Sequence, residues 1–167
     1  SHYDPIGQTW QTLSTTHGLV DNYVQDVVVD HNNELWFATR YGVSHFDPVQ
    51  QTWETITTAD GLVDNNVLAI GIQDNHIFWF GTNGNGVSRY DRTTGLWNTF
   101  DTSNGLAHNS IPLGAITVAG DGKIWIGTLY GVSSYDSVTN VWHSIYVGDG
   151  LPGNTVRTIF IHDNGSV

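Results

Sequence analysis

Eight side chains in this sequence carry the groups that bind polar ligands: they are Tyr23, Arg40, Tyr41, Asn83, Asn85, His108, Tyr130 and Arg157. Aromatic rings present flat apolar surfaces, while guanidinium, amide and imidazole groups donate or accept hydrogen bonds. Such a mixture suits a glycan, another polar small molecule or a protein partner. These residues stand where the copies of an internal repeat differ, so we predict that they form a ligand-binding site.

Residue types and spacing do not favour other chemistry. The eight histidines form no His-x-His or His-x-x-x-His pair, the chain has no cysteine, and no Asp-x-Asp-x-Asp-Gly loop occurs. A Gly-x-Ser-x-Gly nucleophile motif is also missing from the sequence. The glycine-rich residues 81–86 lack the Gly-Lys-Ser/Thr end of a phosphate-binding loop. We therefore expect no metal, no cofactor and no catalytic residues.

The charge balance limits the kinds of partner. Five lysine and arginine residues face 16 aspartate and glutamate residues, which gives a net charge of −11. The sequence lacks the basic residues that neutralise phosphates, so we expect neither nucleic acid nor an anionic membrane surface as a partner. No segment approaches the roughly 18 to 20 apolar residues of a membrane-spanning helix, so we expect no membrane insertion.

An internal repeat of about 44 residues positions the candidate side chains. All seven tryptophans fall at two positions of the repeat, and we predict that they lie in the core. One set is Trp10, Trp53, Trp97 and Trp142, spaced by 43, 44 and 45 residues, and the other is Trp36, Trp79 and Trp125. The predicted units span about residues 1–43, 44–87, 88–132 and 133–167, the last one truncated, within one domain or domain segment.

Each unit contains four short stretches rich in β-branched and aromatic residues, which predict strands a to d. In the first full copy they are residues 23–30, 34–39, 42–47 and 53–58. Turns between strands a and b are expected at residues 31–33, 120–122 and 163–165, and no helical period competes. Four-stranded units without helices are typical of propeller blades, which pack face to face. Small residues on strand b are expected to let neighbouring blades approach: they are Ala38, Gly81 and Gly127.

The predicted fold class is an all-β propeller of about four blades, three complete and one split and incomplete. Residues 1–4 align with strand c at 44–47, and a fourth copy of strand a opens near Asn154. Two arrangements stay open: an arc of a larger propeller or array, and a small ring closed by residues 1–16 near the C-terminal strand. The unpaired backbone groups of an incomplete ring favour the arc. In either arrangement, open blade edges would permit self-association.

Polar residues that recur in every copy are interpreted as structural. One set precedes strand a and is expected to hydrogen-bond the loop backbone, and the other ends strand c and is expected to cap the next turn. These sets are Asn22, Asn65, Asn109 and Asn154, and Asp4, Asp47, Asp91 and Asp136. Ligand binding is expected instead on the loops from d to a and from b to c, which share one face of a propeller and carry the eight candidates.

The repeat resembles a known family, the two-component-regulator propeller repeat. The resemblance lies in the Gly-Leu-x-x-Asn-x-Val opening at 18–24, the Leu-Trp-Phe-Ala-Thr strand at 35–39 and the Gly-Val-Ser-His-Phe-Asp strand at 42–47. In proteins of this kind, such repeats typically build the extracytoplasmic sensor of bacterial hybrid histidine kinases, often as seven-bladed propellers, and they also occur in secreted or surface proteins. The resemblance implies an extracytoplasmic location, periplasmic or secreted.

Three functions from different classes stay open at this point. The first is a non-enzymatic, sensor-like binding or scaffold module that recognises a polar ligand, such as a carbohydrate, or a protein partner through its loops. The second is a structural or surface-assembly protein in which open blade edges join chains. The third is a propeller lyase or glycan hydrolase that would use His108, Tyr130 and Arg40.

Overall fold

Short strands separated by Asn- and Gly-rich turns form four antiparallel sheets in the computed structural model, which describes residues 2–4 and 7–162. Blade 1 contains β3 (Val24–Val29), β4 (Leu35–Thr39), β5 (Gly42–Asp47) and β6 (Thr52–Ile56). Blade 2 contains β7 (Val67–Gln73), β8 (Ile77–Thr82), β9 (Val87–Asp91) and β10 (Leu96–Phe100). Blade 3 contains β11 (Ile116–Val118), β12 (Ile124–Thr128), β13 (Gly131–Asp136) and β14 (Val141–Ile145). The two-stranded sheet pairs β1 (His2–Asp4) with β2 (Thr9–Gln11).

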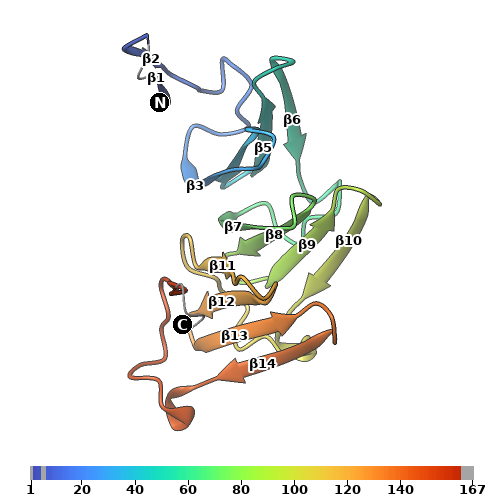
Figure 1. Ribbon diagram of the computed structural model, residues 1–167, viewed down its shortest axis with the longest axis vertical. Coiled ribbons are helices and arrows are strands. Elements are labelled where there is room, and N and C mark those ends of the chain that lie inside the picture. Colours follow the sequence, from blue (N-terminus) through green and yellow to red (C-terminus); the bar gives the residue numbers. More distant parts are fainter. Residues whose placement is uncertain (1, 5–6, 163–167) are drawn as a thin grey trace.

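The blades stack in a curved row, with β3, β7 and β11 along one side and β6, β10 and β14 along the other (Figure 1). Within each blade, every strand pairs with its sequence neighbour, as the repeat predicts. The predicted a-to-b turns contain the required positive φ, at Asn33 (61°) and Gly122 (82°). Predicted residues 163–165 lie outside the described residues. The all-β propeller fold class is confirmed.

Two apolar cores lie between successive blades. Trp36 packs against Phe78 of the next blade, with ring centroids 4.0 Å apart, and both side chains are buried. Gly81 lies where a Cβ atom would stand 2.6 Å from Cγ2 of Ile111, which belongs to the following unit. Because a side chain there would collide with the neighbour, the small strand-b residue is needed for the blades to approach, as the sequence predicts.

The tryptophans of the first set are less buried than predicted. Trp53 and Trp97 are half-buried and cover the opening-loop glycines Gly18 and Gly61 of their own copies, so closely that no Cβ would fit beneath them. Trp10 is 70% exposed, and its predicted place in the core is wrong. The glycine that lies under each of the other three rings precedes that ring by 35 to 37 residues.

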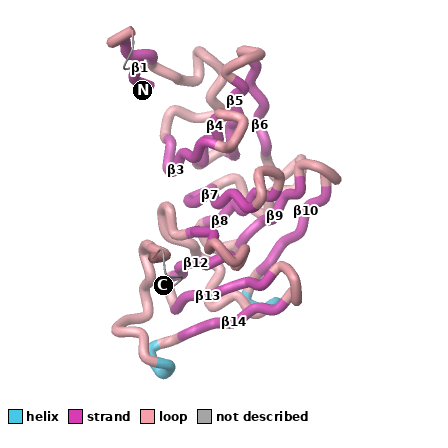
Figure 2. Tube along the Cα trace, in the orientation of Figure 1, coloured by secondary structure: helices cyan, strands magenta, loops and turns pink. Residues whose placement is uncertain are grey.

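The predicted fourth copy of strand a does not form a strand, because residues 151–162 are irregular backbone (Figure 2). The stretch still runs along blade 3, since the Gly131 amide donates to the Asn154 carbonyl at 2.6 Å and the Val156 amide to the Thr128 carbonyl at 2.9 Å. Two 3-10 turns, η1 (Thr102–Asn104) and η2 (Val147–Asp149), lie in the d-to-a loops.

The described strands form an arc. The sheet of β1 and β2 confirms that the first residues align with strands c and d of the repeat. Among the described residues, this sheet contains only those two strands. No helix among the described residues is long and apolar enough to cross a membrane.

Candidate functional site

The recurring asparagines hold the loop in front of each inner strand. The Asn65 Oδ1 accepts a hydrogen bond from the Thr58 amide at 2.8 Å, and its carbonyl accepts one from the Gly42 amide of the preceding blade at 2.8 Å. Asn22 and Asn109 also accept a bond from the amide seven positions earlier, at 2.8 Å each. The predicted structural role is confirmed for these three, although the partner is farther back than in an Asx turn. For Asn154 the structure gives the backbone contact with the Gly131 amide.

The recurring aspartates close the hairpin after strand c, as predicted. The Asp47 Oδ1 accepts from the amides of Val49 and Gln50 at 2.8 and 2.9 Å. The Gln50 amide is the main reason that the pKa of Asp47 lies below its ordinary value, and the Thr139 amide does the same for Asp136. These carboxylates are therefore ionised, and they accept hydrogen bonds from the backbone amides of the turn. The side chain of Asp4 lies outside the described residues.

The first group of predicted ligand-binding residues lies at one corner of blade 1. The guanidinium carbon of Arg40 stands 3.7 Å from the ring centroid of Tyr23, which is a cation–π contact. Tyr41 follows Arg40 in the β4–β5 hairpin and is 65% exposed. Aromatic and cationic groups therefore meet here and stay open to solvent.

The candidates of blade 2 make contacts within and between the loops at this end of the blades. The side-chain amide of Asn85 donates to Asp64 Oδ2 at 2.6 Å, and Asn83 forms an isolated bridge with Ser110. The His108 Nδ1 accepts from the Ser110 amide at 3.0 Å. Asp64 makes the matching contact one copy earlier, since its Oδ1 accepts from the Asn66 amide at 2.9 Å. His108 therefore stabilises a turn, which spacing alone does not reveal.

The last candidates form a third group on blade 3. The ring of Tyr130 lies 6.4 Å from that of Tyr146, and Arg157 is exposed in the irregular C-terminal stretch. Seven of the eight predicted residues thus lie on the d-to-a and b-to-c loops, which we call the loop face, and Arg157 lies in the irregular stretch 151–162. Their assignment to a binding site stays a prediction.

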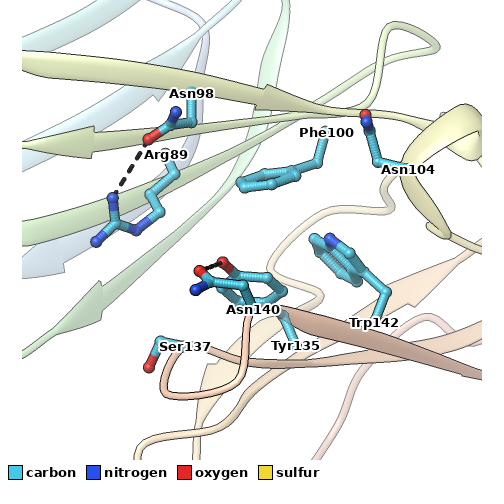
Figure 3. Close-up of a pocket in the computed structure, with 8 residues that line it drawn as sticks. All are labelled: Arg89, Asn98, Phe100, Asn104, Tyr135, Ser137, Asn140 and Trp142. Atoms are coloured by element: carbon cyan, nitrogen blue, oxygen red, sulfur yellow. Dashed lines mark hydrogen bonds between the residues drawn. The ribbon is translucent and has the colours of Figure 1, made fainter.

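A cavity of about 370 Å³ lies elsewhere, between the outer strands of blades 2 and 3 (Figure 3). We call it the inter-blade pocket, and its lining residues are Arg89, Asn98, Phe100, Asn104, Tyr135, Ser137, Asn140 and Trp142. Phe100 comes from β10, Tyr135 from β13 and Trp142 from β14. The ring centroids of Phe100 and Tyr135 lie 5.3 and 4.9 Å from that of Trp142, so the three rings form one aromatic wall.

Polar groups surround this wall. The Tyr135 hydroxyl donates to Asn140 Oδ1 at 2.7 Å, and burial raises the pKa of Tyr135, which keeps the phenol neutral. The Arg89 guanidinium makes a long hydrogen bond, 3.4 Å, to Asn98 Oδ1. The Trp142 Nε1 is buried and has no hydrogen-bond partner among the described residues. The pocket therefore offers an apolar surface together with several donors.

The corresponding place between blades 1 and 2 is occupied by charged side chains, the Arg92 cluster of Asp30, Glu34, His45 and Arg92. The Arg92 Nη1 lies 2.6 Å from Glu34 Oε2 and 3.6 Å from Asp30 Oδ2. His45 Nε2 lies 2.7 Å from the same Glu34 oxygen. The repeat position of Arg92 is held by Ser137 in blade 3, where the Ser137 hydroxyl accepts from Gln73 Nε2 at 2.9 Å. A serine reaches less far than an arginine, so space remains at the second interface.

The inter-blade pocket was not predicted from the sequence, because ligand binding was expected on the variable loops. The available signal was the change from Arg92 to Ser137 at one repeat position, but its meaning depends on which residues of neighbouring blades face each other. Within the described part of the chain, no three His, Asp or Glu side chains gather in a way that would hold a metal ion.

Comparison with known proteins agrees with the blade geometry. Residues 18–41, from the opening loop to the end of strand b, match the family model described as "Two component regulator propeller". The resemblance seen in the sequence is thereby confirmed for one copy. A comparison with curated proteins gives no match.

Solved structures share the fold of this propeller repeat chain. The extracellular domain of a protein described as a hybrid two component system, from B. thetaiotaomicron, matches with a TM-score of 0.79 and 19% identity over 93% of this chain and 22% of that one. The extracellular domain of a one component system from the same organism matches with a TM-score of 0.75 and 20% identity over 98% of this chain and 22% of that one.

A third match is PorZ, described as a bacterial surface component of the type-IX secretion system of Porphyromonas gingivalis, with a TM-score of 0.69 and 20% identity over 95% of this chain and 24% of that one. The propeller repeat chain thus spans between a fifth and a quarter of the length of these structures. At this level of identity the likeness establishes the fold.

Proposed function

We propose that this chain is a non-enzymatic, extracytoplasmic binding module of a sensor-like propeller, and that it holds a polar, ring-containing ligand of the carbohydrate class in the inter-blade pocket. The observation that carries the proposal is the aromatic wall of Phe100, Tyr135 and Trp142, bordered by amide, hydroxyl and guanidinium groups. A volume of about 370 Å³ falls within the usual range of small-molecule sites.

Carbohydrate chemistry suits this lining. A sugar ring has apolar C–H faces, which pack against aromatic rings, and a rim of hydroxyls that both donate and accept hydrogen bonds. The amides of Asn98, Asn104 and Asn140 carry donors and acceptors on flat groups, so each can meet a hydroxyl in either sense.

The extracytoplasmic location and the sensor-like role rest on the comparisons. Two of the similar structures are extracellular domains, and the matched family is described as a propeller of two-component regulators. Recognition of a ligand by such a module would be passed to other parts of a longer protein.

The loop face supports a second site for the same function. Tyr23, Arg40 and Tyr41 are exposed together at one corner of blade 1, and the contact of Arg40 with Tyr23 orders that corner. A glycan or a protein partner would meet these groups without any rearrangement of the blades.

Association between copies is an alternative role that a different observation favours. Val27 and Val29 of β3 are 52% and 58% exposed, and with Leu13, Leu35 and Phe37 they line a groove of about 320 Å³. The matching side of blade 2 is covered, because β7 packs against β3 and β4. A second copy of the chain, stacked as blades 1 and 2 are stacked, would cover these valines.

A binding experiment separates the two candidate sites. Wild-type chain would be screened by isothermal titration calorimetry against a panel of neutral and acidic oligosaccharides. Ser137→Arg places in the pocket the residue that the first interface carries, and we expect it to weaken binding at least about tenfold. The triple change of Arg40, Tyr41 and Tyr130 to alanine should leave pocket binding unchanged. Loss of binding in the triple variant alone would move the site to the loop face, and absence of binding to every oligosaccharide would refute the carbohydrate proposal.

A further inference from the structure

We propose that the inter-blade pocket selects sugars that bear a carboxylate, and that Arg89 binds that carboxylate. This inference rests on the proposed function, because it names the ligand class for the same pocket. The inference comes from comparing Arg89 of blade 2 with the residue at the same repeat position in blade 1.

The position of Arg89 in strand c of blade 2 corresponds to His45 in blade 1. His45 faces two carboxylates, since its Nε2 lies 2.7 Å from Glu34 Oε2 and its Nδ1 lies 3.4 Å from Glu54 Oε2. In blade 1 both ring nitrogens of His45 therefore contact carboxylates of the same blade. Glu54 lies opposite His45 in the register of β5 and β6, and Glu34 directly precedes β4.

Blade 2 has lost both carboxylates at these positions. The place of Glu34, two residues before the strand-b tryptophan, is held by Ile77, and the place of Glu54, opposite the strand-c residue, is held by Asn98. Arg89 forms no ion pair among the described residues, and its hydrogen bond to Asn98 is 3.4 Å long. Arg89 is therefore a cation with no carboxylate at either of the positions that Glu34 and Glu54 hold in blade 1.

The surroundings of Arg89 leave its charge available to a ligand. The pocket lining contains one guanidinium and no Asp or Glu. A guanidinium binds a carboxylate through two parallel hydrogen bonds, which sets both the position and the orientation of the bound acid.

The arrangement of the lining fits an acidic sugar. Figure 3 shows Arg89 at one end of the pocket, Trp142 and Asn104 at the other, and Phe100 between them. A sugar ring against the aromatic wall would direct a carboxylate substituent toward Arg89, while ring hydroxyls reach Asn104 and Asn140. A uronic acid carries its carboxylate on the ring in this way.

The test compares a uronic acid disaccharide with its carboxyl-reduced, uncharged counterpart, each titrated into the wild-type chain by calorimetry. We expect the acid to bind at least about tenfold more tightly. Arg89→Gln should remove this preference and keep binding of the neutral sugar. Asn98→Glu restores an internal carboxylate opposite Arg89, so it should also remove the preference while Arg89 is intact. Lys123→Gln removes a cation that pairs with Asp121 outside the pocket lining, and it is the control, in which the preference should persist.

The outcomes separate this inference from the proposed function. Equal binding of the two sugars by the wild-type chain, or a preference that survives in both Arg89→Gln and Asn98→Glu, would overturn the assignment of Arg89 and leave the pocket as a sugar site. If neither sugar binds, the proposed function fails together with the inference. Far-ultraviolet circular dichroism of each variant confirms that the sheets have formed.

Discussion

The Arg92 cluster gives a quantitative test of how the first two blades are held together. Arg92→Met removes the guanidinium and keeps most of the side-chain stem. Glu34 and Asp30 then lose their shared cation, although their side chains are only 12% and 1% exposed. Leaving a buried carboxylate without its partner typically costs roughly 3 to 5 kcal/mol.

For this protein we expect a smaller loss of stability than that typical cost. The Arg92 side chain is 34% exposed, so solvent already screens part of its attraction for the carboxylates. Asp30 keeps the Trp36 indole as a donor at 3.2 Å and two backbone amides, and Glu34 keeps His45. We therefore expect Arg92→Met to lower the free energy of unfolding by about 2 to 3 kcal/mol.

Urea unfolding followed by tryptophan fluorescence measures this loss, with Arg157→Met as the control for removing an exposed arginine. Combining Arg92→Met with Glu34→Gln should cost less than the sum of the single changes, by about 1 to 2 kcal/mol, because the neutral amide no longer needs the cation. A loss below about 0.5 kcal/mol, with additive double variants, would mean that the cluster is a solvated ion pair that does not hold the blades together.

Two further predictions concern pH and association. Burial raises the pKa of Asp26 above its ordinary value of 3.8, partly offset by the amides of Ile70 and Val27, so the folded chain holds this proton more tightly than the unfolded chain does. That contribution to stability is complete below 3.8 and is lost as pH rises through the raised pKa. The free energy of unfolding of wild type minus that of Asp26→Asn should therefore fall with rising pH in urea titrations, and a flat difference would contradict the burial argument. Light scattering should give a mass that rises above 18.4 kDa with concentration if the valine face of β3 binds a second copy, and Val27→Lys with Val29→Lys should abolish the rise, whereas a constant mass in wild type would exclude this association.

Local sequence was sufficient for the strands and their order. Alternating β-branched and aromatic residues, separated by turns with positive φ at residues such as Asn33, specify each hairpin without help from distant parts of the chain. Burial depends on neighbours and was harder to predict. Trp10 shares the repeat position of Trp53, yet only Trp53 has an opening-loop glycine to cover. Similarly, residues 154–162 resemble strand a, but an inner strand forms by pairing with strand b, and the sequence contains no fourth strand-b motif.

The inter-blade pocket could not be predicted from the sequence for a different reason. In a repeat protein, function is expected on the loops that vary between copies, and Tyr41 and Tyr130 were therefore predicted to bind the ligand. The contact between blades, however, joins different positions of successive copies: the end of strand a in one blade meets the residue after strand c in the next, as Asp30 meets Arg92 and Gln73 meets Ser137. One substitution at such a position changes the contents of a whole interface. In a propeller of near-identical blades, a binding site can therefore arise between two blades while every strand and turn stays the same, and the residues to compare are those that face each other across the interface.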